Sequence, residues 1–348
     1  MNKQKAQVAI VGAGPIGIEL AAVLKSANIS YFQFDKGQVA QAIYDFPPMT
    51  HFFSSNEKIS LLGIPIQTID QQKSTREGYL AYIRSVVGKY QLQINAFEEV
   101  ASIEKQSKYF KLTTVKAGEE RYYQVEFLVL ATGGTSKPRM LHIPGEQLSH
   151  VHAKMLDPHY YFGQKVCIIG GRNSAAENAL RCYQAGANPF LVLQNADFEA
   201  QHVKYWLLPE LLSRIHAKQI GCYYASNVIE IKPGTVIIRN GDCIVEAEAD
   251  FVIKAIGFEA DLSLCRMAGV EILADGKPYH HPDTMETNIE NLFLLGTVIG
   301  GTQKRYEVYI ENSHIHVDRI MDVLLKRLNI QYSKSVNKRG PQIPQLEE

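Results

Sequence analysis

A glycine-rich turn near the start of the sequence restricts the possible folds more than any other feature. The three glycines with the spacing Gly-x-Gly-x-x-Gly are Gly12, Gly14 and Gly17. They follow the apolar run 8–11 and precede a stretch with a helical pattern, residues 18–27. Such glycines permit a tight turn, let the backbone approach a pyrophosphate and let the helix pack on the strand. The pattern predicts a dinucleotide-binding turn, and a turn of purely structural use is the alternative.

An acidic residue follows at the place where such a unit binds ribose. The next predicted strand, residues 31–34, ends at Asp35. A carboxylate there accepts hydrogen bonds from the hydroxyls of an adenosine ribose. The turn and Asp35 together favour the binding interpretation.

A second glycine turn, in the middle of the chain, repeats the first in an altered form. The apolar run 166–169 precedes Gly170 and Gly171, and a helical stretch follows. Arg172 replaces the second glycine of the pattern and Ala175 the third. A side chain at position 172 either obstructs a pyrophosphate or pairs with a phosphate. Two interpretations therefore stay open: a second dinucleotide-binding unit, or a related fold that binds no nucleotide.

The residues after the second turn do not identify a nicotinamide cofactor. Gln194 and Asn195 stand where an NAD-binding unit carries its ribose-binding acid, and neither is acidic or basic. The run 253–257 nevertheless repeats the earlier run 129–133, and each ends in a glycine. We therefore predict an α/β fold with two Rossmann-like dinucleotide-binding domains, the second inserted into the first.

The periodicity of the sequence predicts the remaining organisation. We expect helices over 76–90 and 309–328, a small antiparallel sheet within 92–130 and a linker over 137–159. The expected domain boundaries are 1–148 and 270–330 for the first domain, 149–269 for the second and 331–348 for a C-terminal tail.

Composition excludes several classes of function. Lys plus Arg number 36 and Asp plus Glu number 36, so the formal net charge is zero and we expect no nucleic-acid partner. No apolar run approaches the roughly 20 residues that span a bilayer, so we expect no membrane partner. The five cysteines are scattered without a Cys-x-x-Cys, which is typical of a cytoplasmic protein. The histidines lack zinc-binding spacing, and we expect no metal.

Several less common segments carry a family resemblance over residues 6–328. They are Ala42–Tyr44, Phe52–Lys58, Asn95–Phe97, Ile143–Glu146, Ile169–Ser174, Lys204–Glu210, Met285–Asn288 and Glu307–Asn312. Together they resemble the bacillithiol disulfide reductase family, a group of thioredoxin reductase-like flavoproteins. The resemblance implies a homodimeric oxidoreductase in which FAD takes a hydride from NADPH and passes electrons to a small disulfide. NADH is the alternative donor.

The turns and this resemblance together predict the cofactor contacts. The expected FAD contacts are Gly12, Gly14, Pro15, Ile16, Gly17, Asp35, Lys36, Ser54, Ser55, Ala131, Thr132, Gly133, Gly296 and Thr297. The expected NADPH contacts are Gly170, Gly171, Arg172, Asn173, Ser174, Gln194, Lys204, Ile256 and Gly257. The segment Phe52–Ser55 offers an aromatic pair and two hydroxyls to a flavin, or else forms an ordinary buried loop.

Two departures from the family pattern affect the predicted chemistry. Thioredoxin reductases use a Cys-x-x-Cys, which this chain lacks. The bacillithiol reductases carry a cysteine between the second and third glycines, where this chain has Ile16. No catalytic side chain is therefore assigned, and the acceptor is a small disulfide or another molecule. A flavin monooxygenase, a ferredoxin–NADP reductase-like enzyme and a non-catalytic flavin-binding redox sensor are the alternatives.

Overall fold

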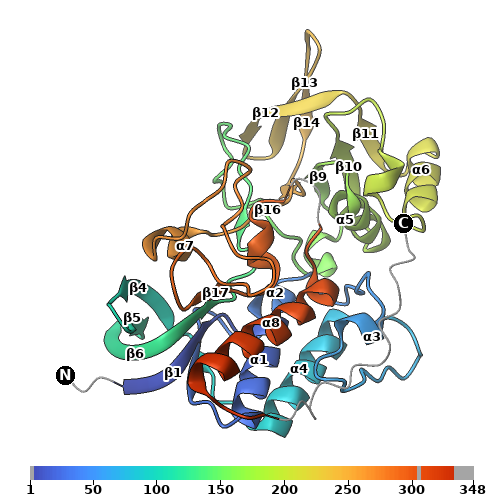
Figure 1. Cartoon of the computed structure of the whole chain (residues 1–348). Helices are drawn as coiled ribbons and strands as arrows, with labels where there is room; N and C mark the ends of the chain where they lie inside the picture. The colour runs from blue at the N-terminus through green and yellow to red at the C-terminus, as the bar shows by residue number, and fades with distance from the viewer. Residues whose placement is uncertain (1–3, 304–306, 333–348) are drawn as a thin grey trace. The chain divides into compact units, whose positions relative to one another are not determined.

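The computed structural model describes residues 4–303 and 307–332, which form two compact units (Figure 1). Unit 1 combines the chain up to Tyr44, Met49–Lys137 and the chain from Glu259 on. Unit 2 contains Pro138–Phe258 and the short segment Asp45–Pro48. Unit 2 is thus inserted into unit 1, and the chain passes between them earlier than the expected boundaries at 148/149 and 269/270. The expected tail 331–348 lies, from residue 333 on, outside the described residues.

Unit 1 is built on a seven-stranded sheet with the order β3-β2-β1-β6-β5-β4, and β17 also pairs with β6. The strands are β1 (Gln4–Val11), β2 (Tyr31–Asp35), β3 (Asn95–Ala96), β4 (Glu99–Lys105), β5 (Phe110–Lys116), β6 (Glu119–Leu130) and β17 (Leu292–Leu294). Strands β17, β6, β1, β2 and β3 are parallel, and β4, β5 and β6 form an antiparallel meander. Parallel strands are buried on both faces, which explains their continuous apolar runs.

Helices of unit 1 lie on both faces of this sheet. They are α1 (Pro15–Ser26), α2 (Gln41–Tyr44), α3 (Asn56–Ile59), α4 (Arg76–Tyr90), α7 (Ser263–Met267), the 3₁₀ turn η3 (Gly296–Gly300) and α8 (Ile310–Leu328). Val8 and Ile10 of β1 pack with α1, α4 and α8, while Ala9 and Val11 face a second core that includes α7. Helix α1 begins earlier than predicted because Pro15 occupies its first turn, where its fixed φ suits a helix.

Unit 2 repeats this plan around a five-stranded parallel sheet with the order β11-β10-β9-β15-β8. Its parallel strands are β8 (Val151–His152), β9 (Lys165–Ile169), β10 (Asn188–Val192), β11 (Gly221–Tyr223) and β15 (Phe251–Lys254). Its helices are η1 (Pro158–Tyr161), α5 (Asn173–Gln184), η2 (Ala200–His202) and α6 (Leu208–His216). A separate antiparallel sheet contains β12 (Ser226–Lys232), β13 (Thr235–Asn240) and β14 (Cys243–Glu248). The short strands β7 (Lys137–Pro138) and β16 (Phe258–Glu259) pair where the chain leaves and re-enters unit 1.

The segment predicted as a linker, 137–159, instead packs into unit 2. Glu146 is buried and accepts hydrogen bonds from the N–H groups of Leu141 and His142, at 2.6 and 2.8 Å. It also accepts from Nζ of buried Lys254, at 2.6 Å, at the end of β15. These contacts fix the segment to the carboxyl end of β15. Within the described ranges, no helix is long and apolar enough to cross a membrane.

Candidate cofactor-binding sites

The turn after β1 has a geometry that requires glycine at two positions. Gly12 has a φ of +121°, and a Cβ there would lie 2.2 Å from the carbonyl oxygen of Ala131, at the end of β6. A Cβ on Gly17 would lie 2.4 Å from the carbonyl oxygen of Gly12. The first glycine lets two parallel strands end side by side, and the third lets α1 pack against the turn.

The second glycine of this turn faces open space. Gly14 is the N-cap of α1, and none of the described atoms lies within 4 Å of the place where its Cβ would stand. Because the N-terminus of a helix carries a partial positive charge, this open position suits a phosphate group. The shape and polarity of the turn therefore fit the pyrophosphate of a dinucleotide.

Asp35 braces this turn as well as standing at the predicted ribose position. Its Oδ2 accepts a hydrogen bond from the N–H of Ala13, and its Oδ1 accepts one from the N–H of Gly37, both at 2.8 Å. A carboxylate has about four lone-pair sites, so both oxygens can also accept from ribose hydroxyls. The bracing role is local, yet the sequence pattern did not reveal it. Lys36, the next predicted contact, is exposed.

The strand end beside the turn offers an unsatisfied hydroxyl. Oγ1 of Thr132 is buried, and it has no hydrogen-bond partner among the described residues. Gly133 follows with a φ of +78°, and the N–H of Gly134 donates to Oγ1 of Thr297 at 3.0 Å. Buried polar groups in proteins are nearly always paired, so an orphan hydroxyl at this place fits contact with a bound polar ligand. The glycine turn, Asp35 and this strand end therefore fit a dinucleotide such as FAD.

Ile16 lies where the resemblance predicts a contact with the cofactor. It is the second residue of α1 and is 6% exposed. A Cβ on Gly296, the first residue of η3, would lie 3.7 Å from Cβ of Ile16. The N–H of Gly296 donates to Nδ1 of His316 at 3.2 Å. The fold thus brings the first turn of α1, η3 and α8 together, although they are far apart in the sequence.

The segment Phe52–Ser55 divides between the core and the surface. The ring of Phe52 packs on buried Tyr79, with 4.6 Å between ring centroids, whereas Phe53 is exposed. The hydroxyl of Ser54 donates to Oε1 of Glu311 at 2.8 Å, and Ser55 is the N-cap of α3. The aromatic pair therefore does not act as one unit. The two serines also differ, since the Ser54 hydroxyl bonds to Glu311 and the Ser55 side chain makes no capping hydrogen bond.

The second glycine turn reproduces the strand crossing of the first. Gly170 has a φ of +137°, and a Cβ there would lie 2.5 Å from the carbonyl oxygen of Ala255, just after β15. A Cβ on Gly171 would lie 3.0 Å from Cδ2 of Leu193. Arg172 is exposed and is the N-cap of α5, the position that Gly14 holds on α1. At this position unit 2 therefore has a long basic side chain, whereas unit 1 has open space.

Lys204 lies beside the start of α5. Its N–H donates to Oδ1 of Asn173 at 2.6 Å, and its Nζ lies 3.5 Å from Oε2 of Glu177 and 5.6 Å from the ring centre of Trp206. Of the predicted nicotinamide contacts, Arg172, Asn173 and Lys204 therefore gather at one helix N-terminus. The remaining predicted contacts are Ser174 and Gln194, which are exposed, and Ile256 and Gly257, which follow β15. The Asn173 contact to the Lys204 backbone was not predicted.

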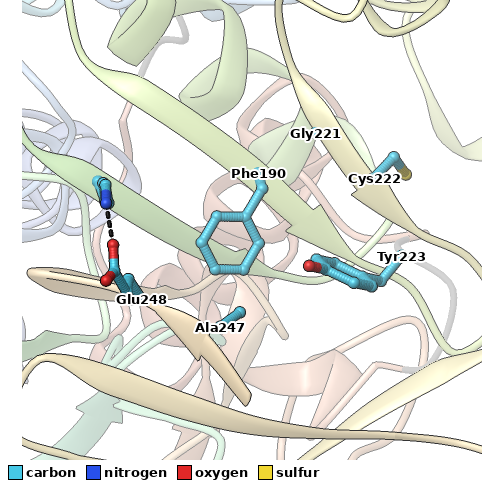
Figure 2. Close-up of a pocket in the computed structure, with 7 residues that line it drawn as sticks. Phe190, Gly221, Cys222, Tyr223, Ala247 and Glu248 are labelled. Atoms are coloured by element: carbon cyan, nitrogen blue, oxygen red, sulfur yellow. Dashed lines mark hydrogen bonds and ion pairs between the residues drawn. The ribbon is translucent and has the colours of Figure 1, made fainter. Parts of the chain in front are cut away.

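A shallow pocket of unit 2 is separate from this turn (Figure 2). The rings of Phe190 and Tyr223 meet edge to face in it, 5.8 Å apart, and Lys165 pairs with Glu248 at its rim. Lys165 is the first residue of β9, whereas the glycine turn follows the last. Ligands of open parallel sheets bind at the carboxyl ends of the strands, so this pocket is not the expected nucleotide site.

The cysteines offer no activated thiol at the first glycine turn. Cys167, Cys182 and Cys222 belong to unit 2, where burial raises the pKa of each thiol, to about 12 for Cys182 and about 11 for Cys222. Cys243, also in unit 2, is exposed. The expected boundaries 149–269 placed Cys265 in the second domain, but it lies in unit 1, because α7 follows the return of the chain at Glu259.

Cys265 lies on the other face of the sheet of unit 1 from Ile16. It packs with Ala9 and Val11, whereas Ile16 packs with Val8 and Ile10. Burial raises the pKa of the Cys265 thiol to about 12, which disfavours the thiolate. A structural role in the core explains this residue.

Two nested dinucleotide folds with these turns define the class of two-domain flavoproteins. The model of the pyridine nucleotide-disulphide oxidoreductase family matches residues 9–296. The bacilliredoxin reductase Bdr of Bacillus subtilis (strain 168) is 32% identical over 323 residues, which are 92% of this chain and 98% of that protein. The structure of the bacillithiol disulfide reductase Bdr (YpdA) from Bacillus cereus has a TM-score of 0.88 at 32% identity, covering 93% of this chain and 100% of that one. Thioredoxin reductase from T. acidophilum has a TM-score of 0.72 at 17% identity, over 93% and 100% of the two chains, and shows the fold alone.

The chain belongs to the pyridine nucleotide-disulphide oxidoreductase family. It is an NAD(P)H-dependent flavoprotein oxidoreductase with FAD as its flavin, and the prediction of a thioredoxin reductase-like fold is confirmed. The prediction of an enzyme that resembles bacillithiol disulfide reductase is also confirmed, and the alternative classes are less supported.

Proposed function

We propose that this protein transfers electrons from NADPH to FAD and that bacillithiol disulfide is a poor final acceptor. The observation that carries the proposal is Ile16, an isoleucine in the first turn of α1 packed against Gly296. The relatives with 32% identity are named as bacillithiol disulfide and bacilliredoxin reductases. Reduction of FAD by NADPH, the half of the reaction that the family shares, is therefore distinct from the choice of acceptor.

The residues of unit 1 would hold FAD. The turn at Gly14 would receive the pyrophosphate at the N-terminus of α1, and Asp35 would accept hydrogen bonds from the adenosine ribose. The orphan hydroxyl of Thr132 would pair with a polar atom of the cofactor. When bound, FAD supplies the redox chemistry, accepting hydride from the nicotinamide and releasing electrons to the acceptor.

The residues of unit 2 would bind NADPH in preference to NADH. Arg172 and Lys204 are cationic groups at the start of α5, and Gln194 places no carboxylate there to repel a 2′-phosphate. An arginine binds phosphate oxygens in a bidentate manner and a lysine binds them as a point charge. The basic residue at position 172 thereby compensates for the missing second glycine.

The poor use of a disulfide follows from the chemistry of thiol exchange. A disulfide is reduced when a thiolate attacks one of its sulfur atoms and forms a mixed disulfide. Isoleucine provides no thiol and no acid–base group. In the described part of unit 1 the only cysteine is Cys265, which is buried on the opposite face of the sheet. Another acceptor, which needs no protein thiol, is therefore the physiological one.

The test compares the parent protein with Ile16→Cys. The measurement is NADPH consumption with bacillithiol disulfide, preceded by anaerobic bleaching of the flavin by NADPH alone. We expect bleaching in both proteins, little disulfide turnover in the parent and a gain of turnover in Ile16→Cys. The control Ile16→Val also shortens the buried side chain but brings no thiol, so it should show no gain. Brisk disulfide turnover by the parent would overturn the proposal.

The quaternary structure and the compartment stay predictions. The family resemblance predicts a homodimer, which light scattering coupled to gel filtration measures directly. A cytoplasmic location is predicted from the scattered cysteines of the sequence.

A further inference from the structure

We propose that the N-terminal half of α8 positions the FAD-binding segments of unit 1, with Glu311, His314 and His316 as the positioning residues. The proposal rests on the FAD contacts proposed above, because each of the three side chains holds a segment that contains one of them or adjoins it. Each contact is made by a polar group at a defined atom of the segment.

His316 holds the turn that faces Ile16. Its ring is buried, and Nδ1 accepts the hydrogen bond from the N–H of Gly296, at 3.2 Å. A ring nitrogen accepts only when it carries no proton, so the contact requires a neutral imidazole. Burial lowers the pKa of His316 to about 4, helped by the positive charge of Arg319 and by His280 and His314. The imidazole is therefore a permanent acceptor at neutral pH.

His314 joins two other segments in a buried network. Its Nδ1 lies 2.5 Å from Oε2 of Glu19, on α1, and its Nε2 lies 3.1 Å from the carbonyl oxygen of Lys58, in α3. Both Glu19 and His314 are buried. A carbonyl oxygen only accepts, so Nε2 carries a proton, and one further proton lies between Nδ1 and the Glu19 carboxylate. The histidine thus fixes α3 relative to the helix that follows the glycine turn.

Glu311 completes the set one turn before His314. Its Oε1 accepts from the hydroxyl of Ser54 at 2.8 Å, so the same side of α8 holds both ends of the segment 54–58. His316 faces a different direction and reaches η3. Helix α8 therefore binds the segments that contain Ser54, Ser55 and Gly296, and through Glu19 it also binds α1.

The polar character of these contacts points to positioning more than to stability. Replacing buried charged or polar groups with well-packed apolar side chains often leaves the stability of a protein unchanged or raises it. An apolar contact, however, does not fix the direction of a backbone N–H or carbonyl group. A hydrogen bond to the Gly296 N–H and another to the Lys58 carbonyl set where these segments stand. We infer that the helix orients the cofactor-binding surface through these hydrogen bonds. Loss of the hydrogen bonds should therefore weaken FAD binding more than it lowers the stability of the fold.

Paired substitutions test the role of each nitrogen atom. Asparagine mimics Nδ1 of histidine and glutamine mimics Nε2. His316→Asn should keep the acceptor for Gly296, while His316→Leu removes it and leaves a buried N–H unpaired. His314→Asn should keep the Glu19 contact, while His314→Gln keeps the Lys58 contact. The control is Ile315→Ala, on the same helix but partly exposed and absent from these contacts.

The readouts are the FAD dissociation constant, the midpoint potential of the bound flavin and the melting temperature. We expect FAD binding roughly tenfold weaker and a shifted potential in His316→Leu, with values near the parent in His316→Asn and Ile315→Ala. For His314, each single-contact variant should weaken FAD binding, and His314→Leu should do so most. Equal losses in His316→Leu and His316→Asn, or a fall in melting temperature with an unchanged dissociation constant and potential, would overturn the inference.

A parent protein that binds no FAD would reject the proposed FAD site itself, and with it this inference. A parent that binds FAD, together with variants that bind it equally well, rejects only the positioning role.

Discussion

Asp35 performs two tasks at the level of a single residue. Its two oxygens accept the N–H groups of Ala13 and Gly37, so the carboxylate holds the shape of the turn before any ligand is present. The same oxygens stand at the predicted position for ribose. Loss of the side chain is therefore expected to affect both the turn and the cofactor.

Asp35→Ala should weaken FAD binding by about 1–3 kcal/mol, because partners of a charged acceptor are left unpaired. Asp35→Asn keeps one oxygen and should lose less. Fluorescence of released FAD gives the dissociation constants, and the purified parent should release FAD on denaturation. Unchanged affinity in Asp35→Ala would show that this carboxylate does not bind the cofactor.

Arg172 and Lys204 should determine the nicotinamide preference. Flavin reduction in the parent should be faster with NADPH than with NADH. The preference should fall in Arg172→Ala, and it should fall further in Lys204→Ala, because Glu177 then loses the cation 3.5 Å away and repels a phosphate.

The measurement for this prediction is the stopped-flow bleaching rate of the flavin with each donor. Lys218→Ala removes an exposed positive charge after α6 and serves as the control. Equal rates with both donors in the parent would contradict the assignment.

At the level of an element, one buried ion pair fixes the segment before β8. Burial opposes ionisation of Glu146, but the hydrogen bonds from Lys254 and from the N–H groups of Leu141 and His142 outweigh it, and the pKa of Glu146 is lowered overall. The carboxylate and the ammonium of Lys254 are both almost fully buried. Each therefore depends on the other for compensation of its charge.

Breaking this pair should destabilise unit 2. Lys254→Met leaves Glu146 buried without its cation, and we expect a loss of about 3–5 kcal/mol in the free energy of unfolding, measured with urea. The double variant Glu146→Leu/Lys254→Met removes both charges and should be less destabilised than Lys254→Met. A single variant as stable as the parent would show that the pair contributes little to the fold.

The same pair explains why the prediction of a linker over residues 137–159 was wrong. Prolines and a lack of periodicity are local signals, and they predicted a linker. The contact that orders the segment joins Glu146 to a residue 108 positions away. Local patterns did succeed where the structure is local: the helix predicted over 76–90 has those bounds, since Thr75 caps it and an αL residue, Gln91, ends it.

For the whole molecule, the buried histidines predict how stability changes with pH. The pKa of His316 is lowered from 6.5 to about 4, and burial also lowers the pKa of His280 and His152. Between pH 4 and 6.5 the unfolded chain binds more protons at position 316 than the folded chain does. The stability that neutral His316 contributes is therefore fully present above about pH 6.5 and is lost as the pH falls toward 4. The full loss from His316 is up to roughly 3 kcal/mol.

Urea unfolding of the parent and of His316→Asn at about pH 5 and pH 7 tests this expectation. The parent should lose more stability on acidification than the variant, because asparagine does not titrate. Equal losses in the two proteins would assign the acid sensitivity to other groups.

The candidate sites were predicted only in part. The glycine turns and Asp35 lie close together in the sequence, so their pattern could be recognised. The contacts of His316 with Gly296 and of Glu311 with Ser54 join residues that meet only in the folded chain. No periodicity or motif predicts such pairs. Cys265 was misplaced for another reason, because the chain returns to unit 1 at Glu259, before the expected boundary at 269/270.

The two close approaches of a glycine to a strand-end carbonyl have a consequence for how such sequences are interpreted. Gly12 and Gly170 are each demanded by a neighbouring backbone oxygen, 2.2 and 2.5 Å from the Cβ that an alanine would add. The strand crossing therefore requires this glycine in each unit whether or not the unit binds a nucleotide, so the first glycine of the pattern indicates the fold alone. The residue two places on is not constrained in this way. Its identity, Gly14 in one unit and Arg172 in the other, is the better indicator of what the unit binds.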